Sequence, residues 1–263
     1  MSTAPAAHPA ETEIHPAHVP EPFLLTTRIL DAPTRRDWRP HVHAEHLLIW
    51  AQDGPVSVSV AGQTWALLRG YGLWIPAGTT HLGITGRGAR FGSTYFVAGQ
   101  ADLFSAVTLV SVGAVQRELL LHLAETPMPA ERRLRAQRVI MDLTLAVTPG
   151  TFAVPHPQDP RIRDLADRVL ADPADDRSLE SWAREYGVSE RTMTRAFNAE
   201  LGLNFARWRL LVRIRAALLL LGSGVPVAEA ARLAGYSTPS AFSAAFRRVQ
   251  GETPTEFLAG LEP

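Results

Sequence analysis

Four of the nine histidines fall into two clusters that could bind a metal ion or an organic ligand. His41, His43 and His46 lie in the segment HVHAEH, and His81 ends the segment GYGLWIPAGTTH. Residues i and i+2 of a strand share a face, so His41 and His43 can meet His81 from a neighbouring strand, whereas His46 faces the other way. Three imidazoles in this arrangement could hold Zn, Fe, Ni or Mn. Hydrogen bonding to an effector and a purely structural role remain alternatives.

A second set of candidate functional residues is positively charged. The 263 residues include 26 acidic and 26 basic side chains, and because the sequence contains no Lys, every basic residue is Arg. Between residues 191 and 215 there are six Arg and one acid, Glu200, a local balance of +5 in a chain of net charge zero. The planar guanidinium suits phosphate groups and guanine edges. This stretch therefore favours nucleic-acid binding, which the total charge does not.

An internal repeat with an offset of 49 residues must position these arginines. Each copy begins with a short amphipathic helix, followed by a glycine, Gly187 or Gly235, that can end a helix and turn the chain. A second helix then opens at a capping residue, which is Ser189 in one copy and Thr238 before Pro239 in the other. This is the outline of a helix-turn-helix. The apolar positions of the second helices correspond as Met193, Ala196 and Phe197 to Phe242, Ala245 and Phe246.

The opposite faces of the two second helices supply the candidate DNA contacts. An exposed helix face with short polar side chains and Arg can enter the major groove of double-stranded DNA. One such face could be an ordinary solvated surface, but two matched copies favour DNA binding. The candidates are Arg191, Thr192, Thr194, Arg195 and Asn198 in the first copy, and Thr238, Ser240, Ser243, Arg247 and Arg248 in the second.

Residues 161–260 resemble the DNA-binding domain of the AraC/XylS family of bacterial transcription regulators. The resemblance lies in the doubled helix-turn-helix, the connecting helix NFARWRLLVRIRAALLLL, the run VAEAARLAGYSTPSAFSAAFRR and the closing GETPTEF. It implies that the second helices enter successive major grooves about 34–36 Å apart. The family's base-reading positions fall on Arg191, Thr194 and Arg195, and on Ser240, Ser243 and Ala244. Because many members have a long polar residue where Ala244 stands, we predict that the first copy dominates sequence readout and the second mainly contacts the DNA backbone.

The histidines lie in a segment with β-type patterning. Short β-rich runs separated by Gly and Pro between residues 23 and 110 predict a sandwich or barrel. The spacing G-x5-P-x-G-x2-H from Gly70 to His81 resembles the second motif of cupins, which are small double-sheet barrels. Metal-binding cupins place a Glu where this chain has Leu47, and a last ligand where it has Thr85. A metal site here would therefore depend on His41, His43 and His81.

Composition and periodicity, taken with the two resemblances, predict a multidomain fold: an N-terminal all-β barrel that the resemblance makes cupin-like, then helices, then an all-α DNA-binding domain with two helix-turn-helix motifs. The predicted parts are a disordered leader (1–22), the sensor barrel (23–110), a helical segment that could pair two subunits (111–148), a Pro- and Gly-rich linker (149–160) and the AraC-type domain (161–263). The longest apolar stretch is too short for a membrane span, and no secretory signal is recognisable, so we expect a cytoplasmic protein without a membrane partner.

These patterns predict a sequence-specific transcriptional regulator that couples a small-molecule or metal signal in the barrel to promoter binding. We expect no catalytic residues and no enzymatic activity, one divalent metal as the candidate cofactor, and double-stranded DNA, an effector and a second copy of the chain as partners. RNA polymerase could be a further partner. Two rival interpretations stay open: a metal-dependent cupin enzyme with an accessory DNA-binding domain, and a constitutive DNA-binding protein with a structural barrel.

Overall fold

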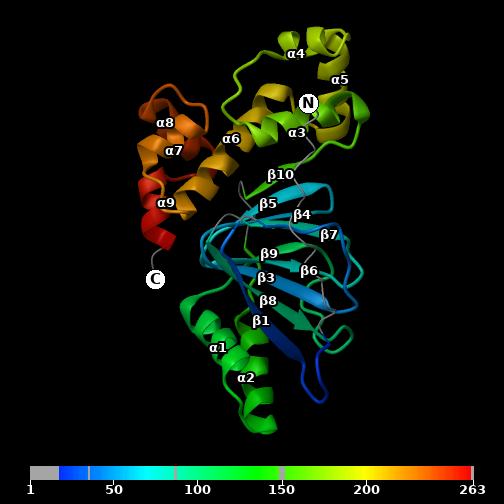
Figure 1. Ribbon diagram of the computed structural model, residues 1–263, viewed down its shortest axis with the longest axis vertical. Helices are drawn as coiled ribbons and strands as arrows, with labels where there is room; N and C mark the ends of the chain where they lie inside the picture. Colours follow the sequence, from blue (N-terminus) through cyan, green and yellow to red (C-terminus); the bar gives the residue numbers. More distant parts are fainter. Residues whose placement is uncertain (1–17, 35, 86–87, 148–151, 262–263) are drawn as a thin grey trace, which may run out of the picture.

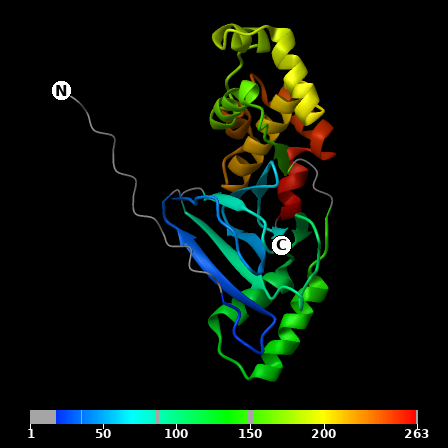
Figure 2. The ribbon, with the colours of Figure 1, turned by 90° about the vertical axis from the view of Figure 1, so that its right-hand side faces the viewer.

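The computed structural model describes residues 18–34, 36–85, 88–147 and 152–261 (Figure 1). The predicted leader lies outside the described residues as far as residue 17. A β-sandwich occupies the middle of the molecule, with one pair of helices on one side and the C-terminal helices on the other (Figure 2). This order of elements confirms the predicted fold class.

Two antiparallel five-stranded sheets form the sandwich. The first sheet has the strand order β1 (Leu25–Ala32), β8 (Ala89–Phe96), β3 (His46–Asp53), β6 (Tyr71–Ile75) and β9 (Thr108–Ser111). The second sheet runs β10 (Ala153–Pro155), β5 (Gln63–Leu67), β4 (Val56–Val60), β7 (His81–Thr85) and β2 (Arg36–Asp37). Strict alternation in β4 buries Val56, Val58 and Val60 and leaves the serines between them half-buried. That pattern is typical of a strand with one face toward the core.

One strand lies inside the segment that composition predicts to be a linker, residues 149–160. Residues 153–155 form β10 and pair with β5, and the amide of Ala66 donates to the carbonyl of Phe152 at 2.7 Å. Phe152 and Val154 are buried, so an alternating apolar pair fixes this connection to the sandwich. A strand of three residues between several prolines has no signal in the composition, so the sequence does not predict it.

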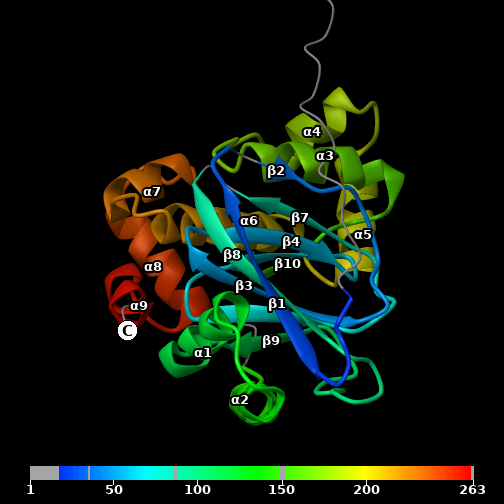
Figure 3. The same cartoon turned by 60° about the horizontal axis from the view of Figure 1, so that its bottom comes forward.

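Two helices, α1 (Ala114–Glu125) and α2 (Ala130–Leu143), cover the outer face of the first sheet (Figure 3). Leu120, Leu123 and Ile140 pack there against Trp50 and Trp74. Burial in α1 does not follow hydrophobicity throughout, because Val115 is 71% exposed while the next residue, Gln116, is buried. The Gln116 amide donates to the Thr144 hydroxyl at 2.7 Å, a partner that hydrophobic periodicity does not reveal.

Seven helices follow the sandwich among the described residues. They are α3 (Pro160–Ala171), α4 (Leu179–Glu185), α5 (Glu190–Leu201), α6 (Phe205–Gly222), α7 (Val227–Leu233), α8 (Pro239–Gln250) and α9 (Pro254–Leu261). The first half of α6 packs with α3, α4 and α5 around Trp182, Phe197 and Trp208. Its second half packs with α7, α8 and α9 in a cluster that contains Phe242 and continues into the sandwich core. The helix α6 therefore joins two helix-turn-helix units and contacts the sandwich.

Candidate functional site

The helices α5 and α8, which we call the reader helices, begin and end in the same way. At the start, the Ser189 hydroxyl accepts the amide of Thr192 at 3.1 Å, and the Thr238 hydroxyl accepts the amide of Ala241 at 3.2 Å. At the end, Gly202 and Gly251 adopt the left-handed conformation. Because these signals are local, they determine the ends of both helices from the sequence alone.

The first reader helix separates an apolar face from a polar one. Met193, Ala196 and Phe197 are buried, whereas Arg191, Arg195 and Asn198 are exposed and Thr192 and Thr194 are half-buried. The Thr192 hydroxyl lies 2.8 Å from that of Ser189, so its contact in the structure supports the helix cap.

The second reader helix has the same division of faces. Phe242, Ala245 and Phe246 are buried, Ser240, Arg247 and Arg248 are exposed, and Ser243 is half-buried. Thr238 acts as the capping residue, and Ala244 leaves the middle of the exposed face without a polar side chain. The structure thus places all ten candidate contacts on or at the start of the outward faces, and their contact with DNA stays a prediction.

The cluster of positive charge between residues 191 and 215 does not form one continuous surface. Arg209 donates to the carbonyl of Arg177 at 2.7 Å, Arg213 donates to the carbonyl of Pro173 at 3.0 Å, and Arg215 is buried. Only Arg191, Arg195 and Arg207 of the six are exposed, and across the described ranges none of these three forms a side-chain ion pair. A sequence count cannot distinguish the faces of α6, so it overstates the charge available to DNA.

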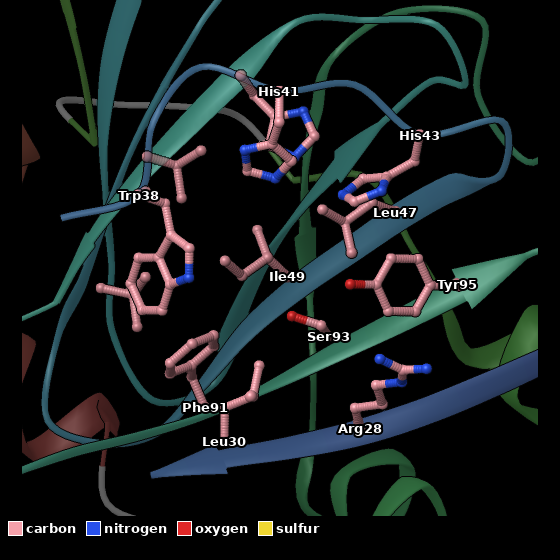
Figure 4. Close-up of a pocket in the computed structure, with 14 residues that line it drawn as sticks. Arg28, Leu30, Trp38, His41, His43, Leu47, Ile49, Phe91, Ser93 and Tyr95 are labelled. Atoms are coloured by element: carbon pink, nitrogen blue, oxygen red, sulfur yellow. The ribbon is translucent and has the colours of Figure 1, made fainter. Parts of the chain in front are cut away.

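The predicted histidine cluster lines a cavity of about 110 Å³ between the two sheets (Figure 4). Apolar side chains from both sheets form much of its wall, among them Leu30, Ile49, Val56, Val58 and Phe91. The polar residues are the three histidines with Arg28, Ser93 and Tyr95. Among the described residues that line it, none carries a carboxylate. Leu47 lies in the wall at the position where metal-binding cupins carry Glu, while Thr85 is buried outside the lining.

His41, His43 and His81 converge at one side of this cavity. One ring nitrogen of each lies within 4.8 Å of those of the other two. Reciprocal backbone hydrogen bonds of 3.0 Å join His41 to His81, and the amide of Gly78 donates to the carbonyl of His43 at 2.9 Å. The loop that carries His41 and His43 is therefore fixed against the start of β7, as required to bring the two sequence motifs together.

Hydrogen bonds to the backbone set the proton positions in two of these rings. Nδ1 of His41 lies 2.8 Å from the carbonyl oxygen of Arg39, and Nδ1 of His81 lies 2.9 Å from that of Thr79. A carbonyl oxygen only accepts, so each Nδ1 carries the proton, and Nε2 of the neutral ring offers a lone pair. Nε2 of His81 is buried without a hydrogen-bond partner among the described residues.

Burial keeps two of the rings neutral. It lowers the pKa of His43 from 6.5 to about 4, with further lowering by His81 and His41. Burial likewise lowers the pKa of His81, against the raising effect of its bond to Thr79. Metal ligation requires unprotonated nitrogen, so both rings are ready to ligate near neutral pH. A tetrahedral ion with bonds of about 2.0–2.1 Å needs ligand atoms about 3.3 Å apart, so ring nitrogens that lie up to 4.8 Å apart would have to approach one another to bind it.

His46 is separate from this cluster, as its spacing predicts. Its Nε2 lies 2.6 Å from Asp102, its Nδ1 accepts the amide of Ala77 at 3.0 Å, and its ring stacks on Trp74. Sequence reasoning missed Arg28, Ser93 and Tyr95, which come from β1 and β8. Neither strand contains a recognisable motif, and the pairing of the two strands sets the place of these side chains.

Two family models match the parts of the chain that contain these sites. The model described as an AraC-like ligand binding domain matches residues 25–137, and the model described as a helix-turn-helix domain matches residues 182–260. The chain belongs to the AraC family of transcriptional regulators. The predicted family and its DNA-binding regulatory function are thereby confirmed.

Curated relatives of this regulator have the same kind of function. It is 27% identical over 226 residues to the HTH-type transcriptional regulator NimR of Escherichia coli, covering 84% of this chain and 82% of NimR. It is 37% identical over 119 residues to the HTH-type transcriptional regulator RipA of Corynebacterium glutamicum, covering 45% of this chain and 36% of RipA. The arabinose operon regulatory protein of Escherichia coli is 32% identical over 108 residues, which cover 40% of this chain and 37% of that protein. These relatives support neither rival interpretation.

Proposed function

We propose that this regulator binds promoter DNA through the outward faces of α5 and α8, and that occupancy of the cavity in the sandwich controls that binding. The observation that carries the proposal is the presence in one chain of a cavity lined by three histidines and of two reader helices, joined through α6. Regulation is the proposed role, because a relative that matches most of this chain is a transcriptional regulator. Since chromosomal DNA is the proposed partner, we expect the regulator in the cytoplasm. Among the described helices, none has the length and apolarity to cross a membrane.

Within this function, we propose that His41, His43 and His81 hold one divalent transition metal. Two rings have Nδ1 bound to a backbone carbonyl, which is the outer contact that orients most metal-ligating histidines. The buried Nε2 of His81 has no hydrogen-bond partner in the described part of the chain, as expected of a ligand atom without its ion. Imidazole suits Zn, Fe and Ni better than Mn, which prefers oxygen ligands. Such an ion would keep open positions toward the apolar part of the cavity, where an organic effector could bind.

A binding assay tests control by the cavity. Protein stripped with EDTA and protein reloaded with Zn²⁺ would be titrated on the DNA upstream of its own gene at fixed salt. We expect binding in both states, with affinities that differ at least threefold, because the ion joins the loop of His41 and His43 to β7. The His46→Ala variant, which leaves the cluster intact, is the control and should respond as the wild type does. Equal affinities with and without Zn²⁺ would contradict metal control.

We also propose a homodimer formed through the outer side of α1 and α2. Their inner side packs on the first sheet, but Val115, Val139 and Leu143 remain 71%, 44% and 36% exposed. Burying this apolar surface against a second copy would remove it from water. Sedimentation of the wild type and of Val139→Asp provides the measurement. The wild type should sediment as a dimer and the variant should shift toward monomer, whereas a monomeric wild type would refute the proposal.

A further inference from the structure

Arg215 is a buried cation at the junction between the sandwich and the DNA-binding helices. It lies on α6 and is 7% exposed. One guanidinium nitrogen, Nη2, donates to the hydroxyl of Ser57 on β4, while Nε is buried without a partner among the described residues. Burial lowers the pKa of Arg215 to about 10, and within the described part of the chain it forms no ion pair with a carboxylate. The neutral hydroxyl of Ser57 is therefore the one side-chain partner of this guanidinium among the described residues.

The strand β4 contacts both the cavity and this arginine. Val56 and Val58 line the cavity, and Ser57 between them points from the opposite face of the strand toward α6. The helix α6 connects the two helix-turn-helix units and also packs on β5 and β10 (Figure 1). A displacement of β4 by a ligand in the cavity would therefore reach Arg215 through one residue.

The rest of this junction is tightly packed and apolar. A Cβ atom added to Gly222 at the end of α6 would lie 2.4 Å from Cδ2 of Leu68 and 3.8 Å from Pro55. A buried arginine without a carboxylate partner weakens such a contact, because a hydroxyl compensates only part of the cost of taking its charge out of water. An apolar side chain of similar length would give a firmer junction, so the arginine makes the docking of α6 reversible.

We propose that the Arg215–Ser57 contact couples the cavity to the reader helices, by keeping α6 docked on the sandwich weakly enough for cavity occupancy to change that docking. The identity of the ligand that acts on the cavity rests on the proposed function. The Arg215–Ser57 contact and its weakening effect on the docking of α6 do not. The proposal makes Arg215 a positioning residue for DNA binding.

Two substitutions that should change the rate of hydrogen exchange in opposite directions test the proposal. Hydrogen exchange would be measured by mass spectrometry on the full-length protein, for peptides that cover β4 and α6. In Arg215→Met the exchange should slow at least threefold, because a buried charge is replaced by an apolar side chain. In Ser57→Ala it should speed up at least threefold, because the guanidinium loses its partner. In the double variant the effect of Ser57→Ala should vanish.

A matched control is available on the same strand face. The Ser59 hydroxyl lies 3.0 Å from that of Thr64 within the sheet, so Ser59→Ala should leave exchange in α6 unchanged. Faster exchange in Arg215→Met, or no change in either single variant, would overturn the proposal by showing an ordinary structural contact.

A second measurement separates this proposal from metal control. The ratio of DNA affinities with and without Zn²⁺ should move toward 1 in Arg215→Met, because firmer docking resists changes in the cavity. The wild type could show no change of DNA affinity with Zn²⁺ while the exchange rates of the two variants change in opposite directions. That result would support the coupling role of the Arg215–Ser57 contact and contradict control by metal. If the exchange rates of the two variants change in the same direction, the coupling role of the Arg215–Ser57 contact is contradicted, whatever the effect of Zn²⁺ on DNA affinity.

Discussion

Substitution of Arg195 by Ala should weaken binding to the preferred DNA by about 1–3 kcal/mol, or roughly 5- to 150-fold. Arg195 is exposed on the outward face of the first reader helix, and within the described parts of the chain it forms no ion pair that would hold its guanidinium away from DNA. A free guanidinium can pair with guanine through two hydrogen bonds, which few exposed side chains can do. Fluorescence anisotropy at fixed salt, with the preferred DNA and with single-base variants, would measure both the loss and any relaxed specificity.

Two matched variants show whether that loss reflects base readout. Arg248→Ala removes an exposed charge at the other reader helix, and should weaken all sequences equally while reducing the salt slope by about 1. Ser243→Ala should be mild, because Ser243 is half-buried and its neighbour Ala244 has no polar group. A mild Arg195→Ala beside a Ser243→Ala that abolishes recognition would reverse the roles assigned to the two copies.

The DNA-binding half was predictable because its signals are local. Ser189, Thr238 and Pro239 start helices through contacts within three residues, and positive φ values of 65° and 84° at Gly187 and Gly235 make the turns. At Gly235 an added Cβ would also lie 2.8 Å from Cα of Ala174, a restriction that the repeat does not reveal. Local capping and turn chemistry therefore predicts where elements begin, but not how closely other segments approach them.

The use of side chains on α6 could not be predicted in the same way. Arg209 and Arg213 satisfy carbonyl oxygens more than 30 residues away, and Arg215 meets Ser57 across 158 residues. The apolar residues of α6 are spread around the helix because both helix-turn-helix units and the sandwich pack on it. Periodicity identifies one buried face, so it gives no guidance for a helix buried on several sides.

The histidine cavity lies between these two cases. The spacing within each motif predicted that His41, His43 and His81 would meet, and the structure places them around one cavity wall. The proton positions depend on the carbonyl groups of Arg39 and Thr79, which belong to the loop conformation. Sequence spacing can therefore bring ligands together, but backbone geometry decides which nitrogen each ring presents.

That geometry leads to the second large expected effect, in His43→Ala. Loss of an outer contact to a ligating histidine typically costs about 10–100-fold in metal affinity, so loss of one of three ligands should cost at least about 100-fold. His43 is buried, is neutral near pH 7 because burial lowers its pKa to about 4, and lies outside the strands of both sheets, so the effect on folding should be smaller than the effect on metal. Metal content after dialysis, and competition with a chromophoric chelator for Zn²⁺, would measure the loss.

His46→Ala distinguishes a metal site from a general effect of histidine removal. The two residues belong to one short segment, but the His46 ring is held by Asp102 and the amide of Ala77, away from the other three rings. This variant should keep stoichiometric Zn²⁺ even if it unfolds at a lower temperature, because its contacts are structural. Wild-type protein without stoichiometric metal would reject the site, and the buried rings of His43 and His81 would then remain as hydrogen-bond acceptors for a ligand that donates to them. Equal metal loss in both variants would instead indicate that the cluster depends on the whole loop, so that His43 would not be a specific ligand.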